Sequence, residues 1–305
     1  MTVLSRVCAW RRARQLRADR LEALYGMNRR NVELIYRYNP RRYYPVADDK
    51  LLAKEYLSRH GVPVPETLAV CRGLFEVEAT LEALSQQSEL VIKPASGSGG
   101  DGIVVLGERE ASGWQTSGAK LMSDAELRQH LAQIVFGAFT SQLEDKALIE
   151  RRVVSHEMFH ELWADGVSDI RVLVLAGKPL LAMLRVPTQR SRGKANLHQG
   201  GLGVAVDIAS GHTTRAVCGR LAVERHPESG VPLLGRQIPD WAGVIDLALR
   251  AAASVPLGYL GVDVVVDRQR GPLVLEINAR PGLEIQNVNA IALGSVVPPH
   301  AGDHE

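Results

Sequence analysis

Residues 90–106 read Leu-Val-Ile-Lys-Pro-Ala-Ser-Gly-Ser-Gly-Gly-Asp-Gly-Ile-Val-Val-Leu, a glycine-rich segment between two short apolar runs. The apolar runs are rich in β-branched residues and predict buried strands on either side of the glycines. Gly97, Gly99 and Gly102 match G-x-G-x-x-G, but a dinucleotide-binding fold needs a helix after that loop, and here a strand follows. We expect a flexible flap whose backbone N–H groups fold over phosphates, with Lys93 supplying a positive charge. An ordinary glycine-rich hairpin loop is the alternative.

A polar cluster is predicted near the end of the chain. Residues 259–266 and 273–278 predict a hairpin of two antiparallel strands. Glu276 and Asn278 are two residues apart and therefore face the same side, and strand pairing brings Asp263 beside them. Three oxygen ligands on one sheet face suit Mg²⁺ (or Mn²⁺) shared with the phosphates of a nucleotide. A solvated polar face on a half-buried hairpin is the alternative.

The zinc-peptidase pattern H-E-x-x-H occurs between His156 and His160. Zinc binding by this pattern needs a stable helix that presents both histidines, and a third ligand further along the chain. The candidate helix ends within a turn or two at Gly166, and no third histidine follows at the metzincin spacing. A zinc hydrolase, with a distant Asp or Glu as third ligand, is therefore a minor alternative.

The composition is that of a globular protein, since 46% of the 305 residues are hydrophobic and 23% are charged. That much apolar surface offsets the entropy of folding and excludes a disordered chain. The longest uncharged apolar run, 251–262, is shorter than the roughly 20 residues that span a bilayer. Cys8, Cys71 and Cys218 have no C-x-x-C spacing, which argues against a disulfide framework and for a reducing compartment. With no secretory signal pattern, we expect a cytoplasmic protein without a transmembrane segment.

The positive charge is concentrated at the N-terminus. Residues 1–45 contain eleven arginines, no lysine and three acids, giving 11 − 3 = +8, so the rest of the chain sums to 2 − 8 = −6. Such an arm suits an anionic partner, such as nucleic acid, the ribosome or an anionic membrane face; a solvated helix face is the alternative. We expect this arm to be dispensable for a nucleotide site that begins near Asp48.

Further hydrophobic patterns predict helices alternating with strand pairs. We expect helices over 49–61, 124–137 and 240–253, a strand over 147–150, and a hairpin of 170–175 and 180–186. This order favours an α+β fold of lobes with mainly antiparallel sheets. The expected divisions are a basic helical extension (1–45), a first lobe with the flap (46–146), a second lobe with the metal site (147–295) and a disordered tail (296–305).

Together these segments resemble the ATP-grasp superfamily, in which two α+β lobes clasp ATP. They most closely resemble the alpha-L-glutamate ligases that modify a ribosomal protein, and especially their glutamate ligase-related branch. The resemblance covers roughly residues 46–290. It is carried by Asp49-Lys50-Leu51, Val91-Ile92-Lys93-Pro94 with its glycine loop, Leu148-Ile149-Glu150-Arg151, Ser168-Asp169-Ile170-Arg171, Ala195-Asn196-Leu197-His198-Gln199-Gly200-Gly201, Gly261-Val262-Asp263 and Leu275-Glu276-Ile277-Asn278-Ala279-Arg280-Pro281-Gly282.

The resemblance also implies roles for individual residues. Lys50 and Lys93 would contact nucleotide phosphates, and the loop of Gly97, Ser98, Gly99, Gly100 and Gly102 would close over them. Glu150 and Arg151 would lie at the adenine hinge, Asp169 near the ribose, and Lys194 and Asn196 beside the nucleotide and acyl-phosphate region. Asp263, Glu276 and Asn278 would hold two Mg²⁺ ions, and Arg171, Arg185 and Arg280 would form the catalytic group.

The sequence differs from the ribosomal-protein glutamate ligases in three features, of which the basic arm and Arg280 point to another carboxylate substrate. A basic segment of about 45 residues stands where those ligases carry a separate α/β domain. Lys194-Ala195-Asn196 replaces their Arg-Ser-Asn, and Arg280 replaces a small residue.

The implied reaction is the activation of a carboxylate by ATP, followed by attack of an amine on the acyl phosphate to leave an amide. Positioning and charge stabilisation carry most of such a reaction. We expect glutamate or a related amino acid as the amine, added to the carboxylate of a protein, a peptide or a small molecule. The alternative is an ATP-binding protein that has lost ligation and acts as a regulatory partner.

Overall fold

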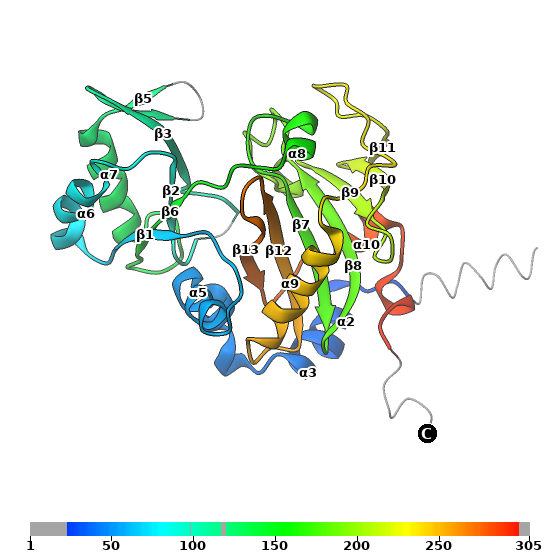
Figure 1. The fold of residues 1–305 in the computed structure, drawn as a ribbon. Coiled ribbons are helices and arrows are strands. Elements are labelled where there is room, and N and C mark those ends of the chain that lie inside the picture. Colours follow the sequence, from blue (N-terminus) through cyan, green and yellow to red (C-terminus); the bar gives the residue numbers. More distant parts are fainter. Residues whose placement is uncertain (1–22, 98, 117–119, 299–305) are drawn as a thin grey trace, which may run out of the picture.

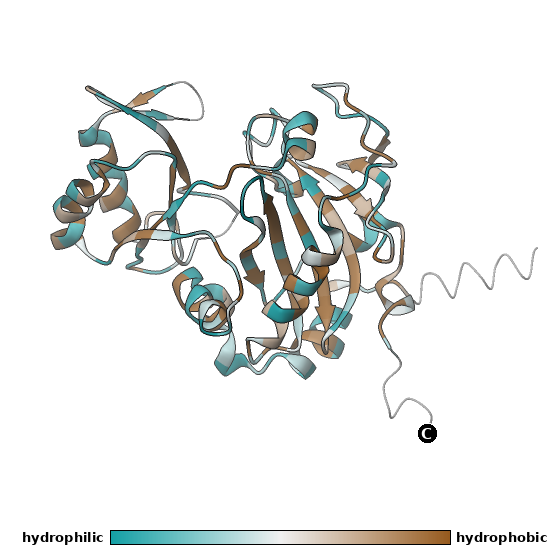
Figure 2. Ribbon diagram, in the orientation of Figure 1, coloured by the Kyte–Doolittle hydropathy of each residue, from teal (hydrophilic) through white to brown (hydrophobic). Residues whose placement is uncertain are grey.

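The computed structural model describes residues 23–97, 99–116 and 120–298, which form two α+β lobes (Figure 1). Each lobe is built on one sheet, with six strands in the first lobe and seven in the second. All strand pairs in both sheets are antiparallel. The predicted α+β class is therefore confirmed. In Figure 2 the strands of both lobes are rich in apolar residues (brown).

The first lobe is a six-stranded sheet covered on one face by two helices. Its strands are β1 (Thr67–Cys71), β2 (Leu90–Pro94), β3 (Val104–Glu110), β4 (Gly113–Thr116), β5 (Leu121–Met122) and β6 (Ala147–Arg151), in the order β1-β6-β2-β3-β4-β5. Helices α6 (Val77–Leu84) and α7 (Asp124–Val135) pack their apolar side chains on this sheet. Helix α7 begins at a capping box, in which Ser123 and Glu126 bond each other's backbone N–H groups.

The second lobe is a seven-stranded sheet in the order β11-β10-β9-β8-β7-β12-β13. Its strands are β7 (Asp169–Leu175), β8 (Lys178–Val186), β9 (Leu202–Val206), β10 (Thr213–Cys218), β11 (Leu221–Val223), β12 (Tyr259–Asp267) and β13 (Gly271–Asn278). Its helices are α2 (Met27–Arg30), α3 (Tyr36–Tyr38), α4 (Pro45–Asp48), α5 (Lys50–Arg59), α8 (Glu157–Leu162), α9 (Trp241–Ala253) and α10 (Glu284–Asn289), with a π-helical turn over Asn31–Ile35. Both predicted hairpins, 170–186 and 259–278, are confirmed.

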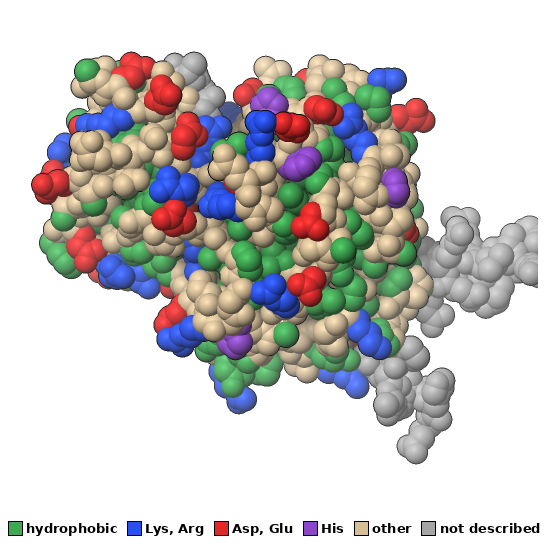
Figure 3. Space-filling view, in the orientation of Figure 1, with side chains coloured by type: hydrophobic (Ala, Val, Ile, Leu, Met, Phe, Trp, Pro, Cys, Tyr) green, Lys and Arg blue, Asp and Glu red, His purple; other side chains and the backbone are tan. Residues whose placement is uncertain are grey.

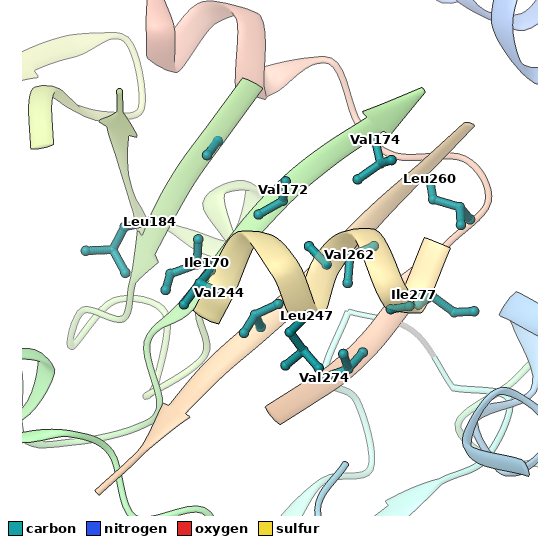
Figure 4. Close-up of a cluster of buried hydrophobic side chains, with 14 of the residues drawn as sticks. Ile170, Val172, Val174, Leu184, Val244, Leu247, Leu260, Val262, Val274 and Ile277 are labelled. Carbon is teal, nitrogen blue, oxygen red and sulfur yellow. The ribbon is translucent and has the colours of Figure 1, made fainter. Parts of the chain in front are cut away.

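Helix α9 covers one face of the second sheet. Its apolar residues recur at helical spacing, and Val244 and Leu247 lie among the side chains of β7, β12 and β13 in Figure 4. The Asp240 side chain begins the helix by accepting a hydrogen bond from the backbone N–H of Gly243. Each fully buried Val or Leu contributes about 1.5–3 kcal/mol, so this layer makes a large contribution to the lobe's stability.

The opposite face of the second sheet is divided into an apolar half and a polar half. In the apolar half, Leu173, Leu175 and Tyr259 pack with α10 and with Leu34 and Ile35 of the N-terminal segment. The polar half carries Asp169, Arg171, Arg185 and Asp263. The same strands therefore build a core at one end and a charged surface at the other.

Residues 23–45, the described part of the predicted basic extension, pack into the second lobe. Tyr25, Leu34 and Ile35 are buried. The Asn39 amide, 1% exposed, donates to the carbonyl oxygens of Tyr259 (2.7 Å) and Ala279 (2.8 Å) and accepts from the Tyr259 N–H (2.9 Å). From residue 25 on, this segment is a structural part of the lobe and not a separate arm. Residues 1–22 lie outside the described residues.

The other boundaries also differ from the expected ones. Helix α5, expected in the first lobe, contributes Ala53 and Leu57 to the core of the second. Strand β6, expected to open the second lobe, pairs with β1 and β2 of the first sheet. The first lobe therefore spans β1 to β6. In the expected tail, Val296 and Val297 pack against the second lobe, and residues 299–305 lie outside the described residues.

The first prediction tests the structural role of the N-terminal segment. Asn39→Ala leaves three buried backbone groups without a hydrogen-bond partner, so we expect a loss of roughly 3 kcal/mol or more in the free energy of unfolding. Urea denaturation measures this loss, with Asn28→Ala, an exposed asparagine of the same segment, as the control. Equal stability of the two variants would show that the segment is not required for folding.

Candidate functional site

A cleft of about 1060 Å³ lies between the two lobes. In Figure 3, Lys and Arg side chains (blue) gather where the lobes meet. Most of the residues singled out in the sequence line this cleft. They are Lys50, Lys93, Gly99, Gly100, Glu150, Arg151, Asp169, Arg171, Arg185, Lys194, Asn196, Asp263, Glu276 and Asn278. Segments far apart in the sequence are thereby brought to one site.

Four charged side chains form an ion-pair network on the floor of the cleft. The Arg171 guanidinium binds both carboxylate oxygens of Asp263, at 2.7 and 2.6 Å. Arg185 bridges Asp263 (2.6 Å) and Asp169 (2.5 Å). This arrangement follows from the register, which places Arg171 opposite Asp263 and Asp169 opposite Arg185.

Burial and the neighbouring arginines shift the pKa values of Asp169 and Asp263 in opposite directions. Burial raises the pKa of Asp169 to about 6, although Arg185 opposes the shift. Burial would also raise the pKa of Asp263, but Arg171 and Arg185 together outweigh it and the pKa is lowered. Asp263 is therefore the more acidic of the two carboxyl groups.

A β-bulge positions the other two predicted metal ligands. Asp263 lies opposite Glu276 while Val264 lies opposite Val274, so Leu275 is the extra residue. The Asn278 amide donates to Asp263 at 3.3 Å. In the part of the chain that the structure describes, the Glu276 carboxylate has neither a hydrogen-bond nor an ion-pair partner, although it lines the cleft.

The donor set of Asp263, Glu276 and Asn278 fits Mg²⁺ or Mn²⁺. It offers carboxylate and amide oxygens only, which are the ligands of hard divalent cations. The unpartnered Glu276 carboxylate is available to a cation entering the cleft. Burial lowers the pKa of Lys50, and Glu276 partly opposes that shift. A positive charge is therefore already near this carboxylate.

On the wall formed by the first lobe, two lysines share one buried carboxylate. Glu150, 3% exposed, pairs with Lys93 at 2.5 Å through one oxygen and with Lys54 through the other. Lys54 also donates to the carbonyl oxygen of Pro65 at 2.6 Å. Burial would raise the pKa of Glu150, but the two lysines outweigh it and the pKa is lowered. The sequence analysis did not identify Lys54.

The glycine loop connects β2 to β3, as predicted, and reaches the second lobe. The Gln199 amide donates to the Gly99 carbonyl at 3.1 Å, and the Lys194 ammonium pairs with Asp101 at 3.1 Å. At Gly102 a side chain is excluded, because φ is +73° and a Cβ atom would lie 2.6 Å from the Phe139 ring. The flap is thus held against Lys194, which by the family resemblance would lie beside the nucleotide.

An apolar part of the cleft was not predicted. It is lined by Val91, Ile103 and Val105 of the first lobe and by Val153 and Leu275 across from them. Val91 and Lys93 lie on the same side of β2, so the period of two in residues 90–93 could have identified this face. Such a slot suits a flat aromatic base.

Some predicted site residues do not line the cleft. Arg280 pairs with Asp48 at 2.5 Å, and its guanidinium lies 4.9 Å from the centre of the Tyr44 ring. It is therefore engaged at the surface and does not reach the Arg171–Arg185 pair. Gly97 and Gly102 lie at the base of the flap, where the Lys50 ammonium donates to the Gly97 carbonyl. Ser98 lies outside the described residues.

The H-E-x-x-H segment does not form the long helix that zinc binding requires. Helix α8 has six residues, and His156 caps it by accepting a hydrogen bond from the Met158 N–H. No cluster of three or more His, Cys, Asp or Glu side chains able to hold a metal ion occurs among the described residues. Phe159 and Leu162 are part of the core, so the segment has a packing role.

The chain is similar to known proteins over most of its length. Residues 29–297 match the sugar-transfer associated ATP-grasp family. The chain is 29% identical over 236 residues to a probable alpha-L-glutamate ligase of Aeromonas salmonicida, covering 77% of this chain and 57% of the relative. It is 27% identical over 238 residues to the ribosomal protein bS6–L-glutamate ligase of Escherichia fergusonii, covering 78% of this chain and 57% of the relative. The chain thus spans little more than half the length of these relatives.

Among solved structures, a biotin carboxylase complex from Campylobacter jejuni aligns with 83% of this chain and 48% of its own, at 17% identity and a TM-score of 0.49. The family match over residues 29–297 includes the flap and every residue that lines the cleft. The predicted resemblance is confirmed, and the chain belongs to the sugar-transfer associated ATP-grasp family.

Proposed function

We propose that this protein is an ATP-dependent carboxylate–amine ligase that forms an amide bond through an acyl phosphate. The observation that carries the proposal is the single cleft that joins a glycine flap, Lys50 and Lys93 to the oxygen ligands of β12 and β13. The names of the relatives support glutamate, or a related amino acid, as the amine. The acceptor would be a peptide or a small carboxylate, and the cytoplasm is the proposed compartment.

Each wall of the cleft would bind a different part of the nucleotide. The apolar slot beside Glu150 and Arg151 would hold adenine, and Asp169 would lie towards the ribose. Lys50, Lys93, Lys194 and Asn196 would hold the phosphates and the acyl phosphate beneath the flap. Asp263, Glu276 and Asn278 would hold Mg²⁺, one or two ions, which neutralises phosphate charge when bound. These assignments use residues that line one cleft.

In the first step, a carboxylate oxygen of the substrate forms a bond to the γ-phosphorus, and the bond to the β–γ bridging oxygen breaks to release ADP. In the second step, the amine nitrogen attacks the acyl carbon, phosphate leaves, and the amine loses a proton. Arg171 and Arg185, oriented by Asp263, would stabilise the charge on the transferred group. No nucleophilic side chain is needed.

The second prediction concerns Glu276. Glu276→Gln removes the unpartnered carboxylate, so we expect Mg²⁺-dependent ADP formation with the cognate substrates to fall by about a hundredfold or more. A coupled ADP assay over amino acids and peptides, followed by mass spectrometry of the product, measures this effect and identifies the substrates. Glu161→Gln, an exposed glutamate elsewhere, is the control.

Unchanged turnover in Glu276→Gln would contradict the metal assignment. ATP binding by the unaltered protein with no ADP formed on any carboxylate and amine would favour the alternative, a nucleotide-binding partner protein without ligase activity.

The third prediction concerns Lys54, which touches Glu150 and not the cleft. In Lys54→Met, Glu150 keeps only Lys93 and holds it away from phosphate, so we expect KM for ATP to rise about tenfold with a smaller change in kcat. Lys54→Arg should restore KM, because it keeps the charge. Lys178→Met, an exposed lysine, is the control.

Steady-state kinetics and the melting temperature of each variant are measured together. A loss of kcat with KM unchanged, or equal KM values in Lys54→Met and Lys54→Arg, would show that Lys54 does not position Lys93.

A further inference from the structure

One surface of the second lobe combines exposed apolar side chains with arginines. It is formed by the helical segment of α2, the π-turn Asn31–Ile35 and α3. Met27, Val32 and Tyr36 are 70, 63 and 54% exposed. Val32 and Tyr36 are four residues apart and lie on the same side of the segment, and Met27 is exposed at its N-terminal end. We call this surface the α2–α3 face.

The α2–α3 face is held on a rigid base. On the other side of the same segment, Leu34 and Ile35 are buried in the apolar half of the second sheet. Arg30 donates to the Pro281 carbonyl at 2.8 Å and fixes the segment to the end of β13. In Figure 1, α2 and α3 lie at the lower end of the second lobe, on the opposite side of the molecule from β5. The apolar side chains are therefore presented outward by a folded element.

Positive charge surrounds the α2–α3 face. Arg37, Arg41 and Arg42 are exposed, and the Arg41 guanidinium lies 5.4 Å from the centre of the Tyr36 ring. Across residues 23–45 there are five arginines and one acid, giving 5 − 1 = +4. Residues 1–22 carry the same net charge, with six arginines and two acids giving 6 − 2 = +4, and include the apolar residues Trp10, Leu16 and Leu21. An anionic partner is therefore favoured.

We propose that the α2–α3 face docks the protein on the surface of an anionic phospholipid bilayer. Aliphatic and aromatic side chains that insert at the headgroup level, flanked by arginines, are the chemistry of an interfacial helix. Met27 and Val32 cannot stack on nucleobases as the aromatic residues of single-strand binders do. No helix in the described ranges is long and apolar enough to cross a membrane, so docking would be peripheral. The inference does not depend on the ligase reaction.

Flotation of the full chain with vesicles tests the proposal. We expect binding to phosphatidylcholine–phosphatidylglycerol vesicles that falls with added salt, and little binding to phosphatidylcholine alone. Arg37→Gln/Arg41→Gln/Arg42→Gln should weaken binding about a hundredfold. Met27→Ser/Val32→Ser/Tyr36→Ser should weaken vesicle binding about tenfold or more. This variant lacks the apolar side chains that insert into the bilayer, and its net charge is unchanged.

The control variants carry the same kinds of substitution outside the α2–α3 face. Arg59→Gln/Arg220→Gln/Arg268→Gln removes three exposed arginines, and Phe75→Ser/Leu143→Ser removes two exposed apolar side chains of the first lobe. Both controls should bind like the unaltered protein, and all variants should keep its melting temperature. Equal binding to neutral and anionic vesicles, or no difference between the variants and their controls, would overturn the proposal. So would binding to single-stranded RNA with no vesicle binding.

Discussion

The buried carboxylate of Asp263 is the constraint on which the cleft depends. A carboxylate that is 1% exposed cannot stay ionised without compensation, and Arg171 of β7 and Arg185 of β8 provide it through direct contacts. Those contacts require β7 and β8 to hold the register that places each arginine near the carboxylate. The strands can therefore carry charge at one end while the other end of the same face is an apolar core. Gly261 supports this arrangement, because a Cβ atom there would lie 2.9 Å from Pro281.

The charges of the site also suggest why metal and nucleotide would bind together. Asp169, Asp263 and Glu276 supply three negative charges, and Arg171, Arg185 and nearby Lys50 supply three positive ones. A divalent cation entering alone would meet carboxylates whose charge is already balanced, so its affinity would be low. Phosphates bring the missing negative charge and draw the arginines and lysines towards themselves. Under the proposed function, the ion pairs seen here keep the cleft folded and ionised until a ligand arrives.

Local patterns were enough to predict the strands and helices that carry the site. Alternation and β-branched runs gave both hairpins of the second lobe, and Asp49 caps α5 near the predicted start. Strand β9 was missed although its run Leu-Gly-Val-Ala-Val is fully buried, since periodicity alone does not distinguish a short apolar strand from part of a buried helix. The pairing of Asp263 with two arginines, the surface position of Arg280 and the role of Lys54 depend on contacts across the chain. No spacing in the sequence encodes such contacts. The N-terminal segment was misplaced for the same reason: its arginines suggested a free arm, whereas its buried side is recognised only by the surface that covers it.

The Lys54–Glu150 ion pair extends this argument to the relation between the lobes. Helix α5 packs in the core of the second lobe, whereas Glu150 lies on a strand of the first sheet. Lys54 thus fixes one oxygen of a carboxylate whose other oxygen holds Lys93. A rotation of one lobe against the other would stretch this contact in a buried setting, where a lost partner costs about 3–5 kcal/mol. The position of Lys93 therefore depends on the angle between the lobes. The flap makes a second connection on the opposite side of the cleft, through exposed contacts of Lys194 and Gln199 that contribute far less. Separating the lobes at this junction would therefore cost more free energy than breaking the contacts of the flap.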